Sequence, residues 1–130
     1  MSALYTLKIL ADFASAHTLR DYPGDCKRMH GHNWKLEVEV TATALNQHGM
    51  GMDFKTMKTA TRELAKTLDH RYLNDIPPFD EINPTAENIA RFFYQRLSST
   101  LNTDTARVSG VTVWETDRAC VKYSEETPTP

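Results

Sequence analysis

Two stretches of the chain alternate between apolar and polar residues with the period of a β-strand. Residues 4–17 carry one apolar parity, made of Tyr5, Leu7, Ile9, Ala11 and Phe13. Residues 34–42 alternate in the same way, from Trp34 to Ala42. Because strand side chains point alternately to the two faces, each stretch predicts a half-buried strand. Together they predict an antiparallel hairpin with a long loop over residues 18–29.

Two later segments show the three-and-four spacing of an amphipathic helix. Asp53 opens the first as an N-cap or first-turn acid, and its apolar stripe comprises Phe54, Met57, Thr61, Leu64 and Leu68. The run Asn83-Pro84-Thr85-Ala86-Glu87 opens the second, whose apolar face comprises Ile89, Phe92, Phe93, Leu97 and Leu101. Residues 73–79 contain consecutive prolines, which exclude a helix there.

Residues 108–115 predict a third strand, and residues 119–123 predict a fourth. The order strand, strand, helix, helix, strand, strand predicts an α+β fold, with a four-stranded antiparallel sheet and both helices on one face. We expect Trp34 and Trp114 in the core. Residues 1–124 are expected to form one domain, and residues 125–130 a loose C-terminal tail. Exposed sheet edges favour oligomerisation.

Composition narrows the functional classes. The 130 residues are 40% hydrophobic, which is enough for a core, and the formal net charge is −2. The chain has no basic block of the kind that indicates a nucleic-acid partner. It also has no apolar run of about 18 residues, which a membrane span requires. The N-terminus lacks a secretory signal, and two cysteines make no disulfide framework. These features predict a cytoplasmic protein with reduced thiols.

The candidate chemistry begins at the His30-Gly31-His32 step, which opens the second strand. In a strand, side chains two residues apart share a face, so these two imidazoles can hold one metal ion. His17 ends the neighbouring strand and is the best third ligand. All-imidazole ligation suits zinc, although copper or nickel would also accept it. Cys26 as a fourth ligand would instead make a closed structural zinc site.

Four further residues carry possible chemistry. Cys26 lies beside Lys27 and Arg28, where positive charge favours the thiolate. Asp69 can orient the adjacent His70, and an imidazole can activate a thiol. Glu115 shares the parity of an apolar face, so it either forms a buried ion pair, turns outward at a bulge, or binds N–H groups of a ligand.

Several motifs together resemble the 6-pyruvoyl-tetrahydropterin synthase superfamily, and most closely its bacterial 6-carboxy-tetrahydropterin synthase branch. The blocks, in chain order, are Phe13-Ala14-Ser15-Ala16-His17, Cys26-x-x-x-His30-Gly31-His32-Asn33, Gly51-Met52-Asp53-Phe54, Leu68-Asp69-His70, Asn83-Pro84-Thr85-Ala86-Glu87-Asn88 and Trp114-Glu115-Thr116. The resemblance implies the tunnelling fold (ββααββ). It also implies a barrel built from several subunits, commonly a hexamer of two stacked trimers, with active sites between subunits.

The resemblance also implies roles for individual residues. Zn²⁺ would be held by His17, His30 and His32. Cys26 would be the general base, with Asp69 and His70 as its relay. The pterin ring would be anchored by Glu115, with contributions from Glu87 and Thr85.

The implied substrate is 7,8-dihydroneopterin triphosphate. Its conversion to 6-carboxy-5,6,7,8-tetrahydropterin releases acetaldehyde and triphosphate, on the route to queuosine and other deazapurines. The three residues between Cys26 and His30 resemble the carboxy branch, because the pyruvoyl-forming branch typically has a longer insertion there. The alternatives are a 6-pyruvoyl-tetrahydropterin synthase, which eliminates triphosphate, and a non-catalytic pterin-binding or structural zinc module. Lys27 and Arg28 are candidate triphosphate contacts.

Overall fold

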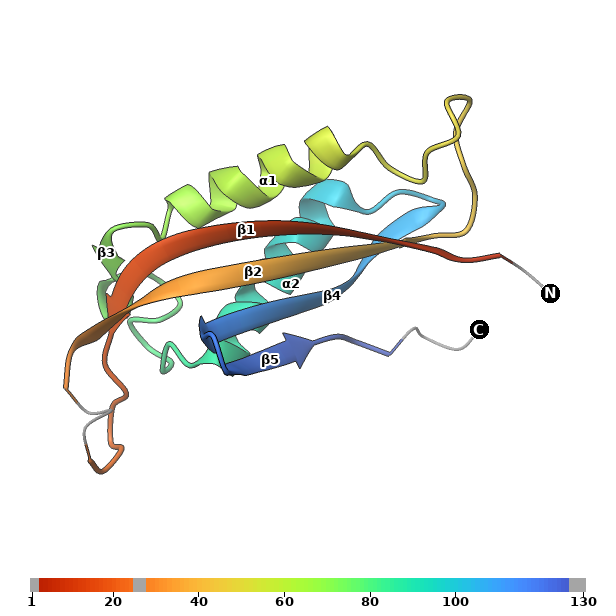
Figure 1. Cartoon of the computed structure of the whole chain (residues 1–130). Helices are drawn as coiled ribbons and strands as arrows, with labels where there is room; N and C mark the ends of the chain where they lie inside the picture. The colour runs from red at the N-terminus through yellow and green to blue at the C-terminus, as the bar shows by residue number, and fades with distance from the viewer. Residues whose placement is uncertain (1–2, 25–27, 127–130) are drawn as a thin grey trace.

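A single curved sheet organises the chain (Figure 1). The computed structural model describes residues 3–24 and 28–126. Its strands are β1 (Tyr5–His17), β2 (His30–Ala42), β3 (Arg71–Tyr72), β4 (Ala106–Thr116) and β5 (Ala119–Tyr123). The sheet order is β3-β1-β2-β4-β5. The long β1–β2 hairpin is confirmed, with thirteen residues in each strand.

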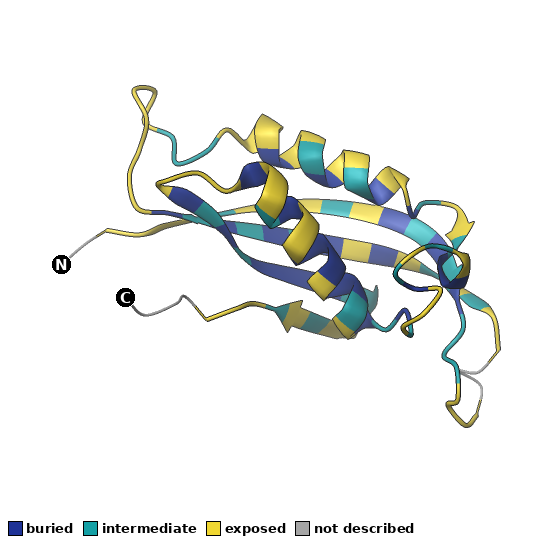
Figure 2. Cartoon of the chain, turned by 180° about the vertical axis from the view of Figure 1, so that it is seen from behind, coloured by how far each residue is buried: buried dark blue, intermediate teal, exposed yellow. Residues whose placement is uncertain are grey.

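Two helices, α1 (Phe54–Lys66) and α2 (Ala86–Leu101), pack on the same face of the sheet (Figure 2). Both begin where the sequence predicts. Asp53 caps α1 by accepting a hydrogen bond from the backbone N–H of Lys55 at 2.8 Å. Thr85 caps α2 in the same way. Between the helices, the proline-containing segment forms only a short 3₁₀ turn, η2 (Leu73–Asp75).

The core lies between the helices and the inner face of the sheet. Alternate residues of β2 are fully buried, beginning with Trp34 and Leu36, and they pack with Met57 of α1 and Phe93 of α2. The prediction for Trp114 is wrong, because this residue is only half-buried. Trp114 pairs with Lys35 on the opposite face, where the Lys35 ammonium lies 5.3 Å from its ring centroid.

The predicted strand count needs a correction. The described sheet has five strands, since β3 adds to the edge of β1. Arg71 and Tyr72 pair in parallel with Ser15 and Ala16, whereas all the other pairs are antiparallel. A two-residue strand has no alternation to detect, so hydrophobic periodicity cannot reveal it.

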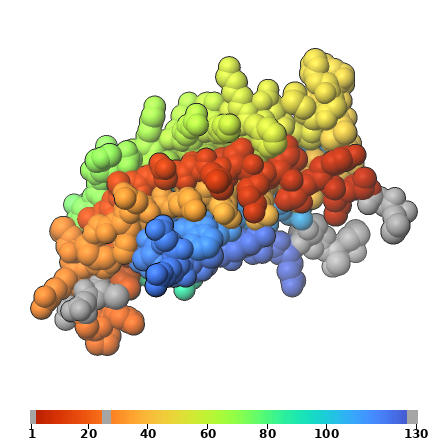
Figure 3. Space-filling view, in the orientation of Figure 1, coloured from red at the N-terminus to blue at the C-terminus, as the bar shows by residue number. Residues whose placement is uncertain are grey.

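Neither helix of the described residues covers the other face of the sheet, which is turned to the viewer in Figure 3. Charged side chains pair across its strands, with Lys8 3.7 Å from Glu37 and Lys122 2.8 Å from Glu39. Neither of the two helices within residues 3–24 and 28–126 combines the length and apolar character of a membrane crossing. The domain boundary at residue 124 stays a prediction, since residues 127–130 lie outside the described residues.

Candidate metal centre

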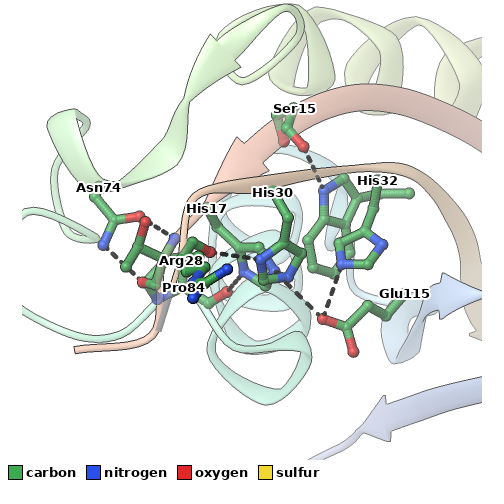
Figure 4. Close-up of polar contacts among 10 residues, drawn as sticks. Ser15, His17, Arg28, His30, His32, Asn74, Pro84 and Glu115 are labelled. Carbon is green, nitrogen blue, oxygen red and sulfur yellow. Dashed lines mark hydrogen bonds and ion pairs between the residues drawn. The ribbon is translucent and has the colours of Figure 1, made fainter. Parts of the chain in front are cut away.

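Three histidines converge at one end of the β1–β2 hairpin (Figure 4). His17 pairs directly with His30 in the register of the two strands, and His32 pairs with Ser15 one step further in. The His17 ring centroid lies 4.4 Å from that of His30 and 5.2 Å from that of His32. The hairpin therefore brings together the three residues that the sequence singles out as metal ligands.

Backbone carbonyls fix the orientation of two of these rings. Nδ1 of His17 lies 2.8 Å from the carbonyl oxygen of Pro84, and Nδ1 of His30 lies 2.8 Å from that of Arg28. A carbonyl oxygen only accepts hydrogen bonds, so each Nδ1 carries the hydrogen and each Nε2 presents a lone pair. The two Nε2 atoms face each other at 2.9 Å. Two lone pairs at this distance repel one another, and a cation between them removes the repulsion.

Burial keeps the imidazoles in the form that binds a metal. Desolvation is the main cause that lowers the pKa of His17, and the hydrogen bond to Pro84 opposes it in part. Desolvation also lowers the pKa of His32, against the opposing effect of the Glu115 carboxylate. Lowered pKa values favour neutral rings, and a metal ion binds only the neutral imidazole.

Glu115 completes this group of side chains. Its Oε1 lies 3.4 Å from Nε2 of His17 and 3.4 Å from Nε2 of His32. A bulge between Trp114 and Thr116 leaves Glu115 without a partner on β5, and its carboxylate faces the histidines. The sequence pattern places Glu115 on an apolar face, but it does not predict this contact with the histidines.

The spacing of the donor atoms suits a bound metal ion. Zinc–nitrogen bonds of about 2.0–2.1 Å put tetrahedral ligand atoms roughly 3.3 Å apart. The nitrogen and oxygen separations here are 2.9 and 3.4 Å, and all four donor atoms lie within 4.8 Å of one another. Nε2 of His32 is also buried with no hydrogen-bond partner in the described part of the chain. A bound ion would satisfy that nitrogen.

A cavity of about 280 Å³ adjoins this cluster. Its lining includes the three residues that the resemblance assigns to the pterin ring, namely Thr85, Glu87 and Glu115. Glu115 thus borders both the histidines and the cavity. Cys120 is exposed and lines the same cavity.

Asp69 and His70 are held against β1 by a two-point contact. Oδ1 of Asp69 accepts the backbone N–H of Ala14 at 2.8 Å, and the backbone N–H of His70 donates to the carbonyl oxygen of Ala14 at 2.6 Å. Oδ2 of Asp69 lies 2.8 Å from Nδ1 of His70. His70 adopts a left-handed backbone conformation, with φ 57°. The hydrogen bonds from Ala14 and then His70 lower the pKa of Asp69.

The structure therefore gives His70 a fixed and exposed ring. Its side chain is 82% exposed. A non-glycine residue with positive φ is strained, and such strain gathers at functional sites. Cys26, the predicted base, lies outside the described residues, so its position relative to His70 stays a prediction.

Paired asparagines hold the loop that follows His17. The side-chain amide of Asn74 accepts from the N–H of Thr18 and donates to its carbonyl, both at 2.9 Å. Asn83 does the same for the backbone of Arg20, at 2.9 and 3.1 Å. Sequence patterns do not reveal such long-range amide pairs. Asn83 directly precedes Pro84, whose carbonyl orients His17, so its bonds to Arg20 tie that segment to the loop.

We expect Asn83→Ala to destabilise the protein by about 1–3 kcal/mol, because it removes two hydrogen bonds to part-buried backbone groups of Arg20. Urea unfolding at fixed protein concentration measures the change. Gln95→Ala, on the exposed face of α2, is the matched control and should leave the midpoint unchanged. Equal midpoints for the two variants would show that the Asn83 pair contributes nothing to stability.

Comparison with known proteins places the chain in a family. Residues 6–126 match the family described as 6-pyruvoyl tetrahydropterin synthase. The chain is 32% identical to the 6-carboxy-5,6,7,8-tetrahydropterin synthase of Aquifex aeolicus, over 78% of this chain and 76% of that protein. It is 36% identical to a putative enzyme of the same name from Archaeoglobus fulgidus, over 78% of this chain and 84% of that protein.

Solved structures agree with the sequence comparison. The 6-pyruvoyl tetrahydropterin synthase of Caenorhabditis elegans superposes with a TM-score of 0.85 at 25% identity, covering 96% of this chain and 98% of that one. The chain therefore belongs to the 6-pyruvoyl tetrahydropterin synthase family of enzymes.

Proposed function

We propose that this enzyme is a zinc-dependent lyase that converts 7,8-dihydroneopterin triphosphate to 6-carboxy-5,6,7,8-tetrahydropterin, an intermediate for queuosine and related deazapurines. One observation carries the proposal. The cluster of three histidines and Glu115 borders a cavity that also contains Thr85 and Glu87. A metal centre beside a cavity with carboxylate and hydroxyl groups suits a small polar heterocycle with a hydroxylated side chain.

Zinc is the ion that best suits the donor set. Three neutral imidazoles are ligands that zinc accepts readily, and a site with three protein ligands leaves the fourth position open for substrate. In this position the ion would supply Lewis acidity toward oxygen atoms of the substrate side chain. His17, His30 and His32 would hold it, and the Nδ1 hydrogens of His17 and His30 point away from the ion toward the backbone carbonyls that accept them.

The remaining residues divide the work of binding and proton transfer. Glu115 and Glu87 would accept hydrogen bonds from N–H groups of the pterin ring, and the Thr85 hydroxyl lies in the same cavity. Asp69 holds Nδ1–H of His70, so Nε2 of that ring is available to exchange a proton with the Cys26 thiol. Proton transfer at positioned groups of this kind needs no redox cofactor.

The edges of the sheet favour an assembly of several subunits. Within the described residues, β3 pairs only with Ser15 and Ala16, so most of the outer edge of β1 has no strand beside it. The opposite edge of the sheet is β5, and both described helices lie on the inner face, away from the outer one (Figure 1). Sheet edges of this kind join strands from other chains. We propose the homohexamer of two stacked trimers, with active sites between subunits.

The experiment is product analysis by mass spectrometry. We expect zinc-loaded protein incubated with 7,8-dihydroneopterin triphosphate to release acetaldehyde and 6-carboxy-5,6,7,8-tetrahydropterin. Release of triphosphate without acetaldehyde would identify the alternative reaction, that of a 6-pyruvoyl-tetrahydropterin synthase. This alternative is supported by a relative, since the chain is 30% identical to the 6-pyruvoyl tetrahydrobiopterin synthase of Dictyostelium discoideum over 92% of this chain. If the pterin is not turned over at all, the result would favour the other alternative, a non-catalytic pterin-binding module.

A further inference from the structure

Glu115 lies between the histidine cluster and the cavity beside it. Its Oε1 is 3.4 Å from Nε2 of His17 and 3.4 Å from Nε2 of His32 (Figure 4). The same side chain lines the cavity of about 280 Å³ together with Glu87 and Thr85. Its carboxylate therefore has two possible partners, a metal ion on one side and a ligand in the cavity on the other.

The contact between Glu115 and the histidines needs a cation. Nδ1 of His17 carries the hydrogen that the Pro84 carbonyl accepts, so the neutral ring has no hydrogen at Nε2 to donate to Glu115. Nε2 of His32 is buried and has no hydrogen-bond partner within residues 3–24 and 28–126. Nitrogen lone pairs thus lie beside a carboxylate oxygen, and like partial charges repel at this distance. A cation bound to all of these atoms replaces the repulsion by attraction.

No side chain of the described residues supplies this cation. Within that part of the chain, Glu115 forms no ion pair with a lysine or an arginine, and neither residue type lines the cavity. The ligand atoms of a tetrahedral zinc ion lie roughly 3.3 Å apart, given bonds of about 2.0–2.1 Å. Both separations of Oε1 from the histidine nitrogens, at 3.4 Å, are close to this value. Oε1 of Glu115 therefore has the position of a ligand atom.

The backbone at Glu115 leaves its side chain free to change partners. Trp114 pairs with Cys120 and Thr116 pairs with Ala119, so the bulge gives Glu115 no partner on β5. Its side chain is 34% exposed, whereas that of His17 is buried and held by the Pro84 carbonyl. The histidines are thus fixed ligands, and Glu115 is a ligand that can leave.

We propose that Glu115 is the fourth ligand of the metal ion in the pterin-free enzyme and that the pterin ring displaces it. The proposal rests on the proposed function and deepens it, because it links recognition of the ring to access to the ion. A pterin presents adjacent N–H groups, from its 2-amino group and N3, and such a pair engages both oxygens of one carboxylate, as an arginine fork does.

The displacement explains why one carboxylate borders both spaces. Once both oxygens of Glu115 accept hydrogen bonds from the ring, neither is available to the ion. The fourth position then opens to an oxygen of the substrate side chain. Without a pterin, Glu115 keeps that position closed to water and to other hydroxyl compounds. The site therefore selects for molecules that carry both the ring and the hydroxylated side chain.

Cobalt(II) in place of zinc tests the ligation, because its visible absorption depends on the number and kind of its ligand atoms. Without any pterin, we expect Glu115→Gln to change this spectrum and to weaken metal binding about 10-fold to 100-fold in competition with a chelator. Glu115→Ala is measured as well, since a glutamine amide oxygen can still bind weakly. Glu87→Gln is the matched control, because Glu87 lines the same cavity but is not in the cluster of donor atoms. It removes the same charge and should change neither the spectrum nor the metal affinity.

Unsubstituted pterin tests the displacement, because it has the ring but no side chain to bind the ion. We expect it to shift the cobalt spectrum of the unmodified protein toward that of Glu115→Gln. The shift should grow in proportion to the pterin bound, which the quenching of pterin fluorescence measures separately.

Two results would overturn the proposal. Identical pterin-free spectra and metal affinities for the unmodified protein and both Glu115 variants would show that Glu115 is not a ligand, as expected if water or Cys26 holds the fourth position. Bound pterin that leaves the spectrum unchanged would show that Glu115 is not displaced. A protein that binds no pterin would overturn the displacement together with the proposed function. The pterin-free comparison needs neither substrate nor turnover, so it separates failure of the ligation from failure of the proposed reaction.

Discussion

Replacing His17 with alanine is expected to remove the metal ion and reduce turnover to background. His17 is fully buried, and its Nε2 lies 2.9 Å from that of His30 and 3.4 Å from Oε1 of Glu115. Substitution of groups that merely orient metal ligands costs about 10-fold to 100-fold in affinity. Loss of a ligand itself should exceed about 100-fold on the same scale. Metal content per subunit after dialysis against a chelator measures the effect.

The controls separate ligation from folding. His17→Gln retains most of the side-chain volume and a donor for the Pro84 carbonyl, so it should keep the fold and still lose the metal. His48→Ala changes an exposed histidine in the loop between β2 and α1 and should keep full metal content. If His17→Ala or His17→Gln binds metal as tightly as the unmodified protein, His17 is not a ligand.

Much of this metal centre is predictable from local patterns. Alternation along residues 4–17 and 34–42 predicts a hairpin, and parity within that hairpin puts His17, His30 and His32 on one face. The observed register pairs His17 with His30 directly. These inferences succeed because strand geometry has a fixed period of two, so a short sequence is enough to determine which side chains share a face.

Features that depend on distant backbone are not predictable in this way. The carbonyl oxygens of Pro84 and Arg28 fix two imidazole rings. Every residue has a backbone carbonyl, so the amino-acid sequence does not indicate which carbonyl will accept a hydrogen bond from a given ring. Glu115 reaches the histidines because a bulge leaves it unpaired on β5, and bulges break the very alternation on which parity depends. The two-residue strand β3 is likewise too short to show a period.

The Asp69-His70 pair combines a feature that the sequence predicts with one that it does not. Its two residue types suggest a carboxylate–imidazole contact, and the structure confirms that contact at 2.8 Å. The contacts with Ala14 and the positive φ of His70 follow only from the tertiary fold, since Ala14 lies 55 residues earlier in the chain. The sequence therefore predicts the chemical pairing but not the constraint that fixes its direction.

Asp69→Asn is expected to lower kcat by about 10³-fold, within the range for loss of general acid–base catalysis or for a wrong imidazole tautomer. Both carboxylate oxygens accept hydrogen bonds, Oδ1 from Ala14 and Oδ2 from His70. An asparagine has one acceptor oxygen, so its amide nitrogen would face either the Ala14 N–H or His70 Nδ1–H. Relief of the second clash moves the hydrogen of His70 to Nε2, where the proposed exchange with Cys26 needs a lone pair.

Steady-state kinetics and metal content are measured together. The control is Asp12→Asn, which changes an exposed aspartate of β1. Unchanged metal content with a kcat equal to that of the control would exclude His70 from proton transfer.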